Sequence, residues 1–349
     1  MTPAPAAEQP PDSPPTDSYL HEWIDAIASI RSMKPQAWRR YKQIVDSHLA
    51  PFFGDRPLAA IGKRDVIELI DALRHGRTNG RPQGDTSIHH IHAVLRKAFE
   101  DAVSEELLAV NVVRLVKAPP MRHREKVFLS REDADRLLRA ARGARLEAAI
   151  VLAVCTGVRE GELLALRRRD VDLEAGTLWI RANAALGWDG TMVLDEPKTR
   201  AGVRLLELPE IAIAALEAHV AGLPTEREQL LFPSAEGGIL SGTNFVKHHW
   251  HPVLKRSGLP HMTFHDVRHS AATILRSTGV VDEYTLSKIL GHSTPAITSR
   301  LYGTMGDGRA RAAATAMDAA LTGQRARQQA RARRGAAKMA SNGKQAPVS

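Results

Sequence analysis

Apolar residues recur at helical spacing through the first third of the chain. From Ser18 to about Leu115 they fall three and four positions apart, which places each run along one face of a helix. The runs cover residues 19–30, 38–53, 66–73 and 88–108. The first two stripes consist of Leu20, Trp23, Ile24, Ile27, Trp38, Tyr41, Ile44, Val45, His48 and Leu49. A series of short amphipathic helices predicts a small all-α bundle.

The pattern changes after Pro120, where short strand-like segments join the helical ones. Ser130, followed three residues later by Asp133, is typical of a helix start. Helices are predicted at 131–141, 146–155 and 159–168, strands at 171–174, 177–181, 191–194 and 203–208, and further helix from 210 to about 321. We therefore expect a mostly α protein with a small antiparallel sheet, in which an all-α domain precedes an α+β domain.

Breaks in these patterns predict the domain boundaries. The first sixteen residues contain six prolines and no periodicity, which is typical of disorder, and Ala118-Pro119-Pro120 marks a linker. We expect a leader at 1–16, a helical domain at 17–117, a basic linker at 118–126, a second domain at 127–308, a C-terminal helix at 309–321 and a disordered tail at 322–349. Ala313, Met317 and Leu321 would form the apolar stripe of the C-terminal helix.

Composition narrows the class of protein. Of 349 residues, 43% are hydrophobic and 25% are charged, a balance typical of globular proteins. The longest apolar stretch, Ala148–Cys155, is too short to span a bilayer, and no cation precedes Arg31 to begin a secretory signal. A single cysteine excludes an internal disulfide and a cysteine-rich zinc site. We expect a cytoplasmic, nucleoid-associated protein with no membrane partner.

The net charge of +9 is unevenly distributed. Residues 321–349 contain seven Lys or Arg and no acid, so this tail carries +7 and the rest of the chain only +2. A basic appendage on a nearly neutral body favours a polyanionic partner such as nucleic acid. A solvated tail that only aids solubility explains the same charge distribution.

Cationic residues stand at the ends of predicted elements in the second domain. Arg159 and Glu162 lie at i and i+3, so the carboxylate is able to hold the guanidinium in place, although an ordinary surface ion pair has the same spacing. Lys198 falls between two strand candidates, which predicts a position at the tip of a β-hairpin.

Histidine and tyrosine complete the set of chemically useful residues. His265 and Arg268 share the face of a helix that runs toward Ser277. His265 and His269 also resemble the zinc-protease pattern His-Glu-x-x-His, but Asp266 stands where that pattern has glutamate. His292 and Tyr302 follow within Leu290–Gly303.

In this order and spacing, the motifs resemble the tyrosine recombinase (phage integrase) family. The likeness covers residues 127–305 in motif and residues 18–115 in architecture, the latter as a helical core-binding domain. It implies catalytic roles for Arg159, Lys198, His265, Arg268, His292 and Tyr302. It further implies a site-specific DNA recombinase or integrase that needs no metal, ATP or other cofactor.

The resemblance also implies a role for each residue. Tyr302 would attack phosphorus and form a covalent 3′-phosphotyrosyl link. Arg159, Arg268 and His292 would bind the phosphate, since charge-assisted hydrogen bonds from fixed donors stabilise growing negative charge. Lys198 would protonate the departing 5′ oxygen, and His265 would assist proton transfer.

Double-stranded DNA at attachment or recombination sites is the expected partner. The family's two domains clamp the duplex, and the candidate contacts here are Arg39, Arg40, Lys42, His89, His90, Arg96, Lys97, Arg122, Arg124 and Lys126. A solvated surface explains each of these charges equally well. We expect a homotetramer on synapsed DNA and a monomer or weak oligomer when free, and a directionality factor is a further candidate partner. The C-terminal helix would dock on a neighbouring protomer or on its own domain.

Other functions stay open on the sequence alone. The leading hypothesis is integration or excision of a mobile element. A resolvase of chromosome or plasmid dimers and a non-catalytic DNA-binding protein are the alternatives, and a zinc hydrolase built on His265 and His269 is a further one.

Overall fold

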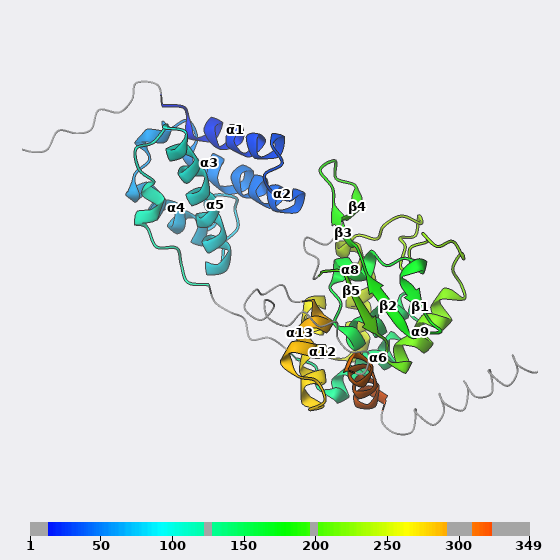
Figure 1. Cartoon of the computed structure of the whole chain (residues 1–349). Helices are drawn as coiled ribbons and strands as arrows, with labels where there is room; N and C mark the ends of the chain where they lie inside the picture. The colour runs from blue at the N-terminus through cyan, green and yellow to red at the C-terminus, as the bar shows by residue number, and fades with distance from the viewer. Residues whose placement is uncertain (1–12, 122–127, 196–201, 292–308, 323–349) are drawn as a thin grey trace, which may run out of the picture. The chain divides into compact units, whose positions relative to one another are not determined.

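The protein consists of two compact units, Met1–Glu125 and Lys126–Ser349, each with its own core. The computed structural model describes residues 13–121, 128–195, 202–291 and 309–322 (Figure 1). None of the helices in these ranges is both long and apolar enough to cross a membrane.

The first unit is a bundle of helices, as the apolar periodicity predicts. Its elements are α1 (Thr16–Ser29), α2 (Pro35–Ile44), a π-helical turn (Val45–Leu49), α3 (Ala50–Phe53), a 3₁₀ turn (Leu58–Ala60), α4 (Lys63–Arg74), α5 (Asp85–Ser104) and a second 3₁₀ turn (Val112–Leu115). The helix expected over 38–53 is thus continuous from α2 through α3, with one π turn in its middle. The stripe residues Leu20, Ile24 and Leu49 are completely buried, which confirms the predicted core face.

The second unit begins with helices that the sequence predicts well. Ser130 caps α6 (Arg131–Ala141), and its hydroxyl accepts a hydrogen bond from the amide of Asp133. Next come α7 (Glu147–Thr156) and α8 (Glu160–Leu164), so the third helix ends four residues earlier than expected. Later helices are α9 (Glu210–Val220), α10 (Gly242–Phe245), a π turn (Val246–Trp250), α11 (His251–Ser257), α12 (Phe264–Ser277) and α13 (Glu283–Leu290).

Two small antiparallel sheets lie between α8 and α9. Strands β1 (Val171–Asp172), β2 (Thr177–Ile180) and β5 (Arg204–Glu207) form one sheet in the order β1-β2-β5. Strands β3 (Asn183–Leu186) and β4 (Met192–Asp195) form a separate hairpin, which stands out from the body of the unit in Figure 1.

The β3–β4 hairpin corrects the expectation for Lys198. The strands on either side of this lysine do not pair with each other, because β4 pairs with β3 and β5 pairs with β2. The sequence pattern missed β3, whose residues Asn183–Leu186 are all only half buried and lack the alternation of a one-sided strand. The described strands that flank residue 198 in the chain thus belong to different sheets.

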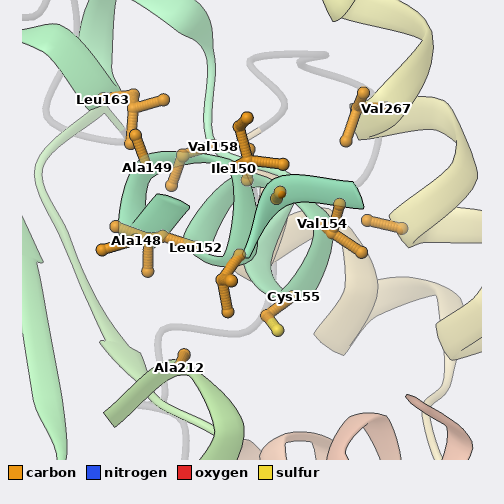
Figure 2. Close-up of a cluster of buried hydrophobic side chains, with 14 of the residues drawn as sticks. Ala148, Ala149, Ile150, Leu152, Val154, Cys155, Val158, Leu163, Ala212 and Val267 are labelled. Atoms are coloured by element: carbon orange, nitrogen blue, oxygen red, sulfur yellow. The ribbon is translucent and has the colours of Figure 1, made fainter. Parts of the chain in front are cut away.

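Helix α7 is the centre of the second core. It is apolar all round, and nine of its ten residues are buried. Leu163 of α8, Ala212 of α9 and Val267 of α12 surround it in Figure 2. Because α8 and α12 pack on this one rigid helix, Arg159 at the start of α8 and Arg268 within α12 are held against a common support.

The alanine-rich C-terminal helix spans residues 309–322 and packs on its own unit. Ala313, Met317 and Leu321 are buried in the core, as their spacing predicts. The Asp318 carboxylate accepts a hydrogen bond from the amide of Ile211 at the start of α9, at 3.1 Å. Of the two docking modes considered for this helix, the structure shows packing on its own domain.

Candidate active site

Arg159 and Glu162 form the first part of the site, where α7 turns into α8. Gly157 adopts the left-handed conformation that ends α7, and Arg159 is the N-cap of α8. The Glu162 carboxylate accepts hydrogen bonds from the Arg159 amide at 3.0 Å and from its Nη1 at 2.7 Å. The predicted contact is therefore confirmed, but it is no surface ion pair, because the Glu162 side chain is only 7% exposed.

A third residue, Arg204 at the start of β5, shares the Glu162 carboxylate. Its Nη2 donates to Oε2 at 2.7 Å and its Nη1 to Oε1 at 3.1 Å, and its side chain is likewise 7% exposed. Burial of the Glu162 carboxylate acts to raise its pKa, but the hydrogen bonds and charge of Arg204, together with Arg159, outweigh burial and lower the pKa. Glu162 is thus an anion fixed between two cations.

Arg268 joins the site from α12, where Thr263 and Asp266 form a capping box that starts the helix. Its guanidinium is almost fully buried and donates to the carbonyl oxygens of Gly157 and Leu290, at 2.8 and 2.7 Å. Burial, with the nearby charge of Arg159, lowers the pKa of Arg268 to about 10, so the group is still cationic near neutrality.

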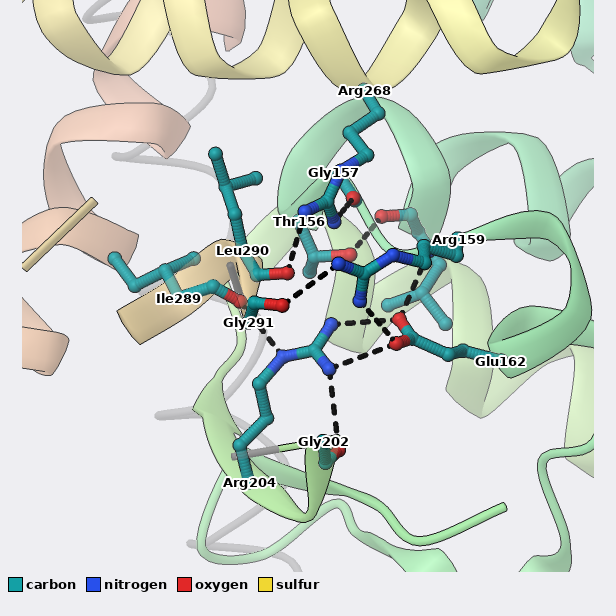
Figure 3. A network of polar contacts seen from close by, with 11 residues as sticks. Thr156, Gly157, Arg159, Glu162, Gly202, Arg204, Arg268, Ile289, Leu290 and Gly291 are labelled. Carbon is teal, nitrogen blue, oxygen red and sulfur yellow. Dashed lines mark hydrogen bonds and ion pairs between the residues drawn. The ribbon is translucent and has the colours of Figure 1, made fainter. Parts of the chain in front are cut away.

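The three guanidiniums meet at the C-terminal end of α13 (Figure 3). Arg204 donates to the carbonyl of Ile289 at 2.9 Å, Arg268 to that of Leu290, and Arg159 to that of Gly291 at 2.7 Å. The last carbonyls of a helix have no partner within it and carry partial negative charge, so cations stabilise this end. Residue 292, the predicted His292, is the next position in the chain.

The prediction that His265 and Arg268 share one face of α12 is wrong, because His265 is exposed while Arg268 is buried in the unit. The imidazole of His265 packs edge-on against that of His269, with ring centres 4.8 Å apart. Among the residues that the structure describes, no three His, Cys, Asp or Glu side chains gather as metal ligands would. Within that part of the chain, His265 and His269 thus lack the third ligand that a zinc hydrolase would need.

The other predicted catalytic residues, Lys198, His292 and Tyr302, lie outside the described residues, as do Arg122, Arg124 and Lys126 of the linker. The structure therefore brings together Arg159 and Arg268 and places His265 on the same helix as Arg268.

The candidate DNA contacts of the first unit fall into two groups. Lys42, Arg96 and Lys97 each form an ion pair with an acid one helical turn further on, respectively Asp46, Glu100 and Asp101. Arg39 and Arg40 lie on α2 and His89 and His90 on α5, and the charge of Arg40, after burial, helps to lower the pKa of His90. Helices α2 and α5, which carry Arg40 and His90, contact each other.

Sequence reasoning missed Arg204. The signal was present in the alternation of β5, because Leu206 and Leu208 are buried on the same side as Arg204. A charged residue at an inward-facing strand position requires a buried partner of opposite charge.

Comparison with known proteins identifies the family of this chain. The sequence model of the phage integrase family matches residues 127–307, more than half of the chain. The chain belongs to the phage integrase family. This integrase also matches the family's N-terminal SAM-like domain over residues 17–74, within the helical unit. It is therefore a tyrosine recombinase of the phage or mobile-element type.

Several curated proteins are similar to this integrase along most of its length. It is 28% identical over 295 residues to a putative prophage phiRv2 integrase of Mycobacterium tuberculosis, covering 84% of this chain and 75% of the relative. It is 27% identical over 314 residues to a XerC-like tyrosine recombinase of Caldanaerobacter subterraneus, covering 81% and 77%. The ICEBs1 integrase of Bacillus subtilis is 26% identical over 282 residues, with coverage of 77% and 74%.

Solved structures show the same fold. The Tn1549 transposon integrase in complex with a circular intermediate DNA superposes with a TM-score of 0.68 at 21% identity, covering 85% of this chain and 98% of that one. A lambda integrase tetramer bound to a Holliday junction superposes with a TM-score of 0.58 at 19% identity, covering 81% and 79%. The predicted mostly α fold with small antiparallel sheets is confirmed.

Proposed function

We propose that this integrase cuts and rejoins double-stranded DNA through a covalent link between Tyr302 and a 3′ phosphate, and so integrates or excises a mobile element. The observation that carries the proposal is the pair of guanidiniums of Arg159 and Arg268. They come from segments more than a hundred positions apart, yet they donate to the successive carbonyls of Gly291 and Leu290, directly before His292. Two fixed cations in one place suit the two non-bridging oxygens of a phosphodiester, which share its negative charge.

In the proposed reaction, the phenol oxygen of Tyr302 attacks phosphorus and displaces the 5′ oxygen of the neighbouring nucleotide. A bond forms between tyrosine and phosphorus while the bond to the 5′ oxygen breaks, and Lys198 supplies the proton that this oxygen takes up. Arg159, Arg268 and His292 stabilise the charge on the non-bridging oxygens, and His265 assists removal of the phenol proton. A 5′ hydroxyl from another strand then reverses the step, so neither ATP nor a metal takes part.

The distribution of tyrosines supports Tyr302 as the nucleophile. The chain has only four, and two of them, Tyr19 and Tyr41, belong to the helical unit. The Tyr19 hydroxyl is buried and donates to the carbonyl of Ala98 at 2.9 Å. Tyr284 lies on α13, where its ring packs against the Lys288 ammonium at 5.4 Å. Tyr302 is thus the tyrosine that follows the arginine cluster in the chain.

DNA is the proposed partner because the Tn1549 integrase and the lambda integrase with the same fold are bound to DNA in their structures. By the same comparison, we expect a tetramer during strand exchange, as in the lambda complex with a Holliday junction. Since Lys42, Arg96 and Lys97 are paired with acids, Arg40 and His90, on the contacting helices α2 and α5, are the best phosphate contacts of the helical unit. A resolvase of DNA dimers is the second candidate, favoured by the likeness to a XerC-like recombinase.

The test is a covalent adduct assay. A nicked duplex taken from the flanks of the gene is incubated with the full chain in EDTA, and denaturing gels detect the protein–DNA adduct. We expect an adduct with the native protein and with Tyr284→Phe, and none with Tyr302→Phe. An adduct that survives Tyr302→Phe, or one that forms only when a divalent metal is added, would contradict the proposal. Attachment-site duplication at the gene's flanks favours integration, and a multimer-resolution site favours dimer resolution.

A further inference from the structure

We infer that Arg204 is a positioning residue of the active site, which holds Glu162 and the end of α13 and thereby sets the orientation of Arg159. This inference rests on the proposed function, because its consequence is a slower cleavage step. Arg204 lies on the buried side of β5, and each of its three guanidinium nitrogens donates to an acceptor of the protein itself. Its influence on the reaction therefore passes through the residues that it contacts.

The contacts of Arg204 join three elements that are distant in the sequence. Its Nε donates to the carbonyl of Ile289 on α13, and its two Nη atoms donate to the two oxygens of Glu162 on α8. Nη1 also lies 3.4 Å from the carbonyl of Gly202, just before β5. A planar guanidinium satisfies this fork of acceptors with one side chain, whereas an ammonium has no such planar geometry.

Glu162 transmits the position of Arg204 to Arg159. Each carboxylate oxygen accepts from both arginines, so the two guanidiniums flank the same anion. The Arg159 side chain is 38% exposed and can adopt other rotamers once its anchor moves. A carboxylate locked by Arg204 restricts Arg159 to the rotamer that also reaches the Gly291 carbonyl.

The end of α13 is the second part of this arrangement. Gly291 closes the helix in the left-handed conformation, and a Cβ at this residue would lie 2.8 Å from Nη1 of Arg204. The guanidinium of Arg204 therefore packs directly beneath the turn that leads into residue 292. Loss of this contact would free both the turn and the Ile289 carbonyl, at the position where three cations converge.

The first experiment measures single-turnover adduct formation by Arg204→Lys with saturating full-length protein. The matched control is Arg181→Lys, because Arg181 is exposed in the same unit and packs on the Trp179 ring at 4.8 Å. We expect Arg204→Lys to keep the DNA affinity and the fraction of active molecules, but to lower the rate constant on the order of 100-fold, the cost of an ångström-scale misplacement of a catalytic group. Arg181→Lys should react at the native rate. A native rate for Arg204→Lys, or a reduced amplitude with an unchanged rate constant, would overturn the inference.

A double-mutant cycle separates positioning from general structural support. If Arg204 acts through Arg159, the variant Arg159→Ala/Arg204→Lys should react no more slowly than Arg159→Ala alone. Multiplicative effects of the two substitutions would contradict the inference.

Amide hydrogen exchange tests Arg204 without relying on catalysis. In Arg204→Lys, exchange should accelerate at the end of α13 and in α8 and stay unchanged in α6. Unchanged exchange at the end of α13 would overturn the inference about Arg204, whether or not the native protein forms an adduct. Failure of the native protein to form an adduct would instead count against the proposed function.

Discussion

Glu162 and Glu228 offer a direct test of how burial determines the worth of an ion pair. Each carboxylate lies between two arginines, Glu162 between Arg159 and Arg204, and Glu228 between Arg167 and Arg169. The Glu162 side chain is 7% exposed and that of Glu228 is 59% exposed. Each carboxylate has two arginine partners, so the main difference between the sites is solvent exposure, together with the Arg159 amide that also donates to Glu162.

Removal of Glu162 would leave the buried guanidinium of Arg204 without a counter-charge. Breaking a buried pair in this way costs about 3–5 kcal/mol, whereas exposed pairs contribute about 0–1 kcal/mol. We therefore expect Glu162→Ala to lower the free energy of unfolding of the second unit by about 3–5 kcal/mol, and Glu228→Ala by less than about 1 kcal/mol.

Hydrogen exchange of the α7 amides in urea reports unfolding of the second unit alone, because α7 is the centre of its core. At about 1.4 kcal/mol per factor of ten, Glu162→Ala should accelerate this exchange by about two to four orders of magnitude. Glu228→Ala should change it by less than about tenfold. Equal effects of the two substitutions, or a loss below 1 kcal/mol for Glu162→Ala, would refute the reasoning from burial.

Three further predictions concern pH, backbone conformation and the helical unit. Folding lowers the pKa of Glu162, so its contribution to stability is present above the unfolded pKa of about 4.3 and is lost as pH falls through the lower folded pKa. Glu162→Gln should therefore reduce the loss of stability at low pH, measured by urea unfolding from pH 3 to 6. Gly291→Ala should destabilise the second unit by more than the roughly 1–2 kcal/mol of a left-handed alanine. The control is Gly279→Ala, which should cost less, since Gly279 has a similar φ but no atom within 4 Å of an added Cβ. Equal losses of stability in urea unfolding would count against the Arg204 contact. Tyr19→Phe should cost the helical unit about 0.5–1.5 kcal/mol by removing the buried hydrogen bond from its hydroxyl to the Ala98 carbonyl, measured by exchange in α5, while Tyr41→Phe should cost less; the reverse order would show that the buried hydrogen bond is not the cause.

Local sequence patterns were enough to predict the elements whose formation depends on near neighbours. The stripe at Leu20, Trp23 and Ile24 predicts α1, and Ser130 with Asp133 predicts the start of α6, since apolar periodicity and capping act within a few residues. The contact between Arg159 and Glu162 was predictable for the same reason, because i and i+3 positions adjoin on any helix. The chemistry of the motifs likewise indicated the family.

How these local elements combine depends on contacts between residues that are distant in the sequence. Glu162 is a buried anion rather than the partner in a surface ion pair, because β5 brings Arg204 to it from 42 positions away in the sequence. Arg159 and Arg268 meet because α8 and α12 pack on α7, and the carbonyls at the end of α13 then receive both guanidiniums. The pairing of β4 with β3 rather than with β5 could likewise not be predicted from the local pattern, since strand pairing depends on non-local contacts that propensity does not encode.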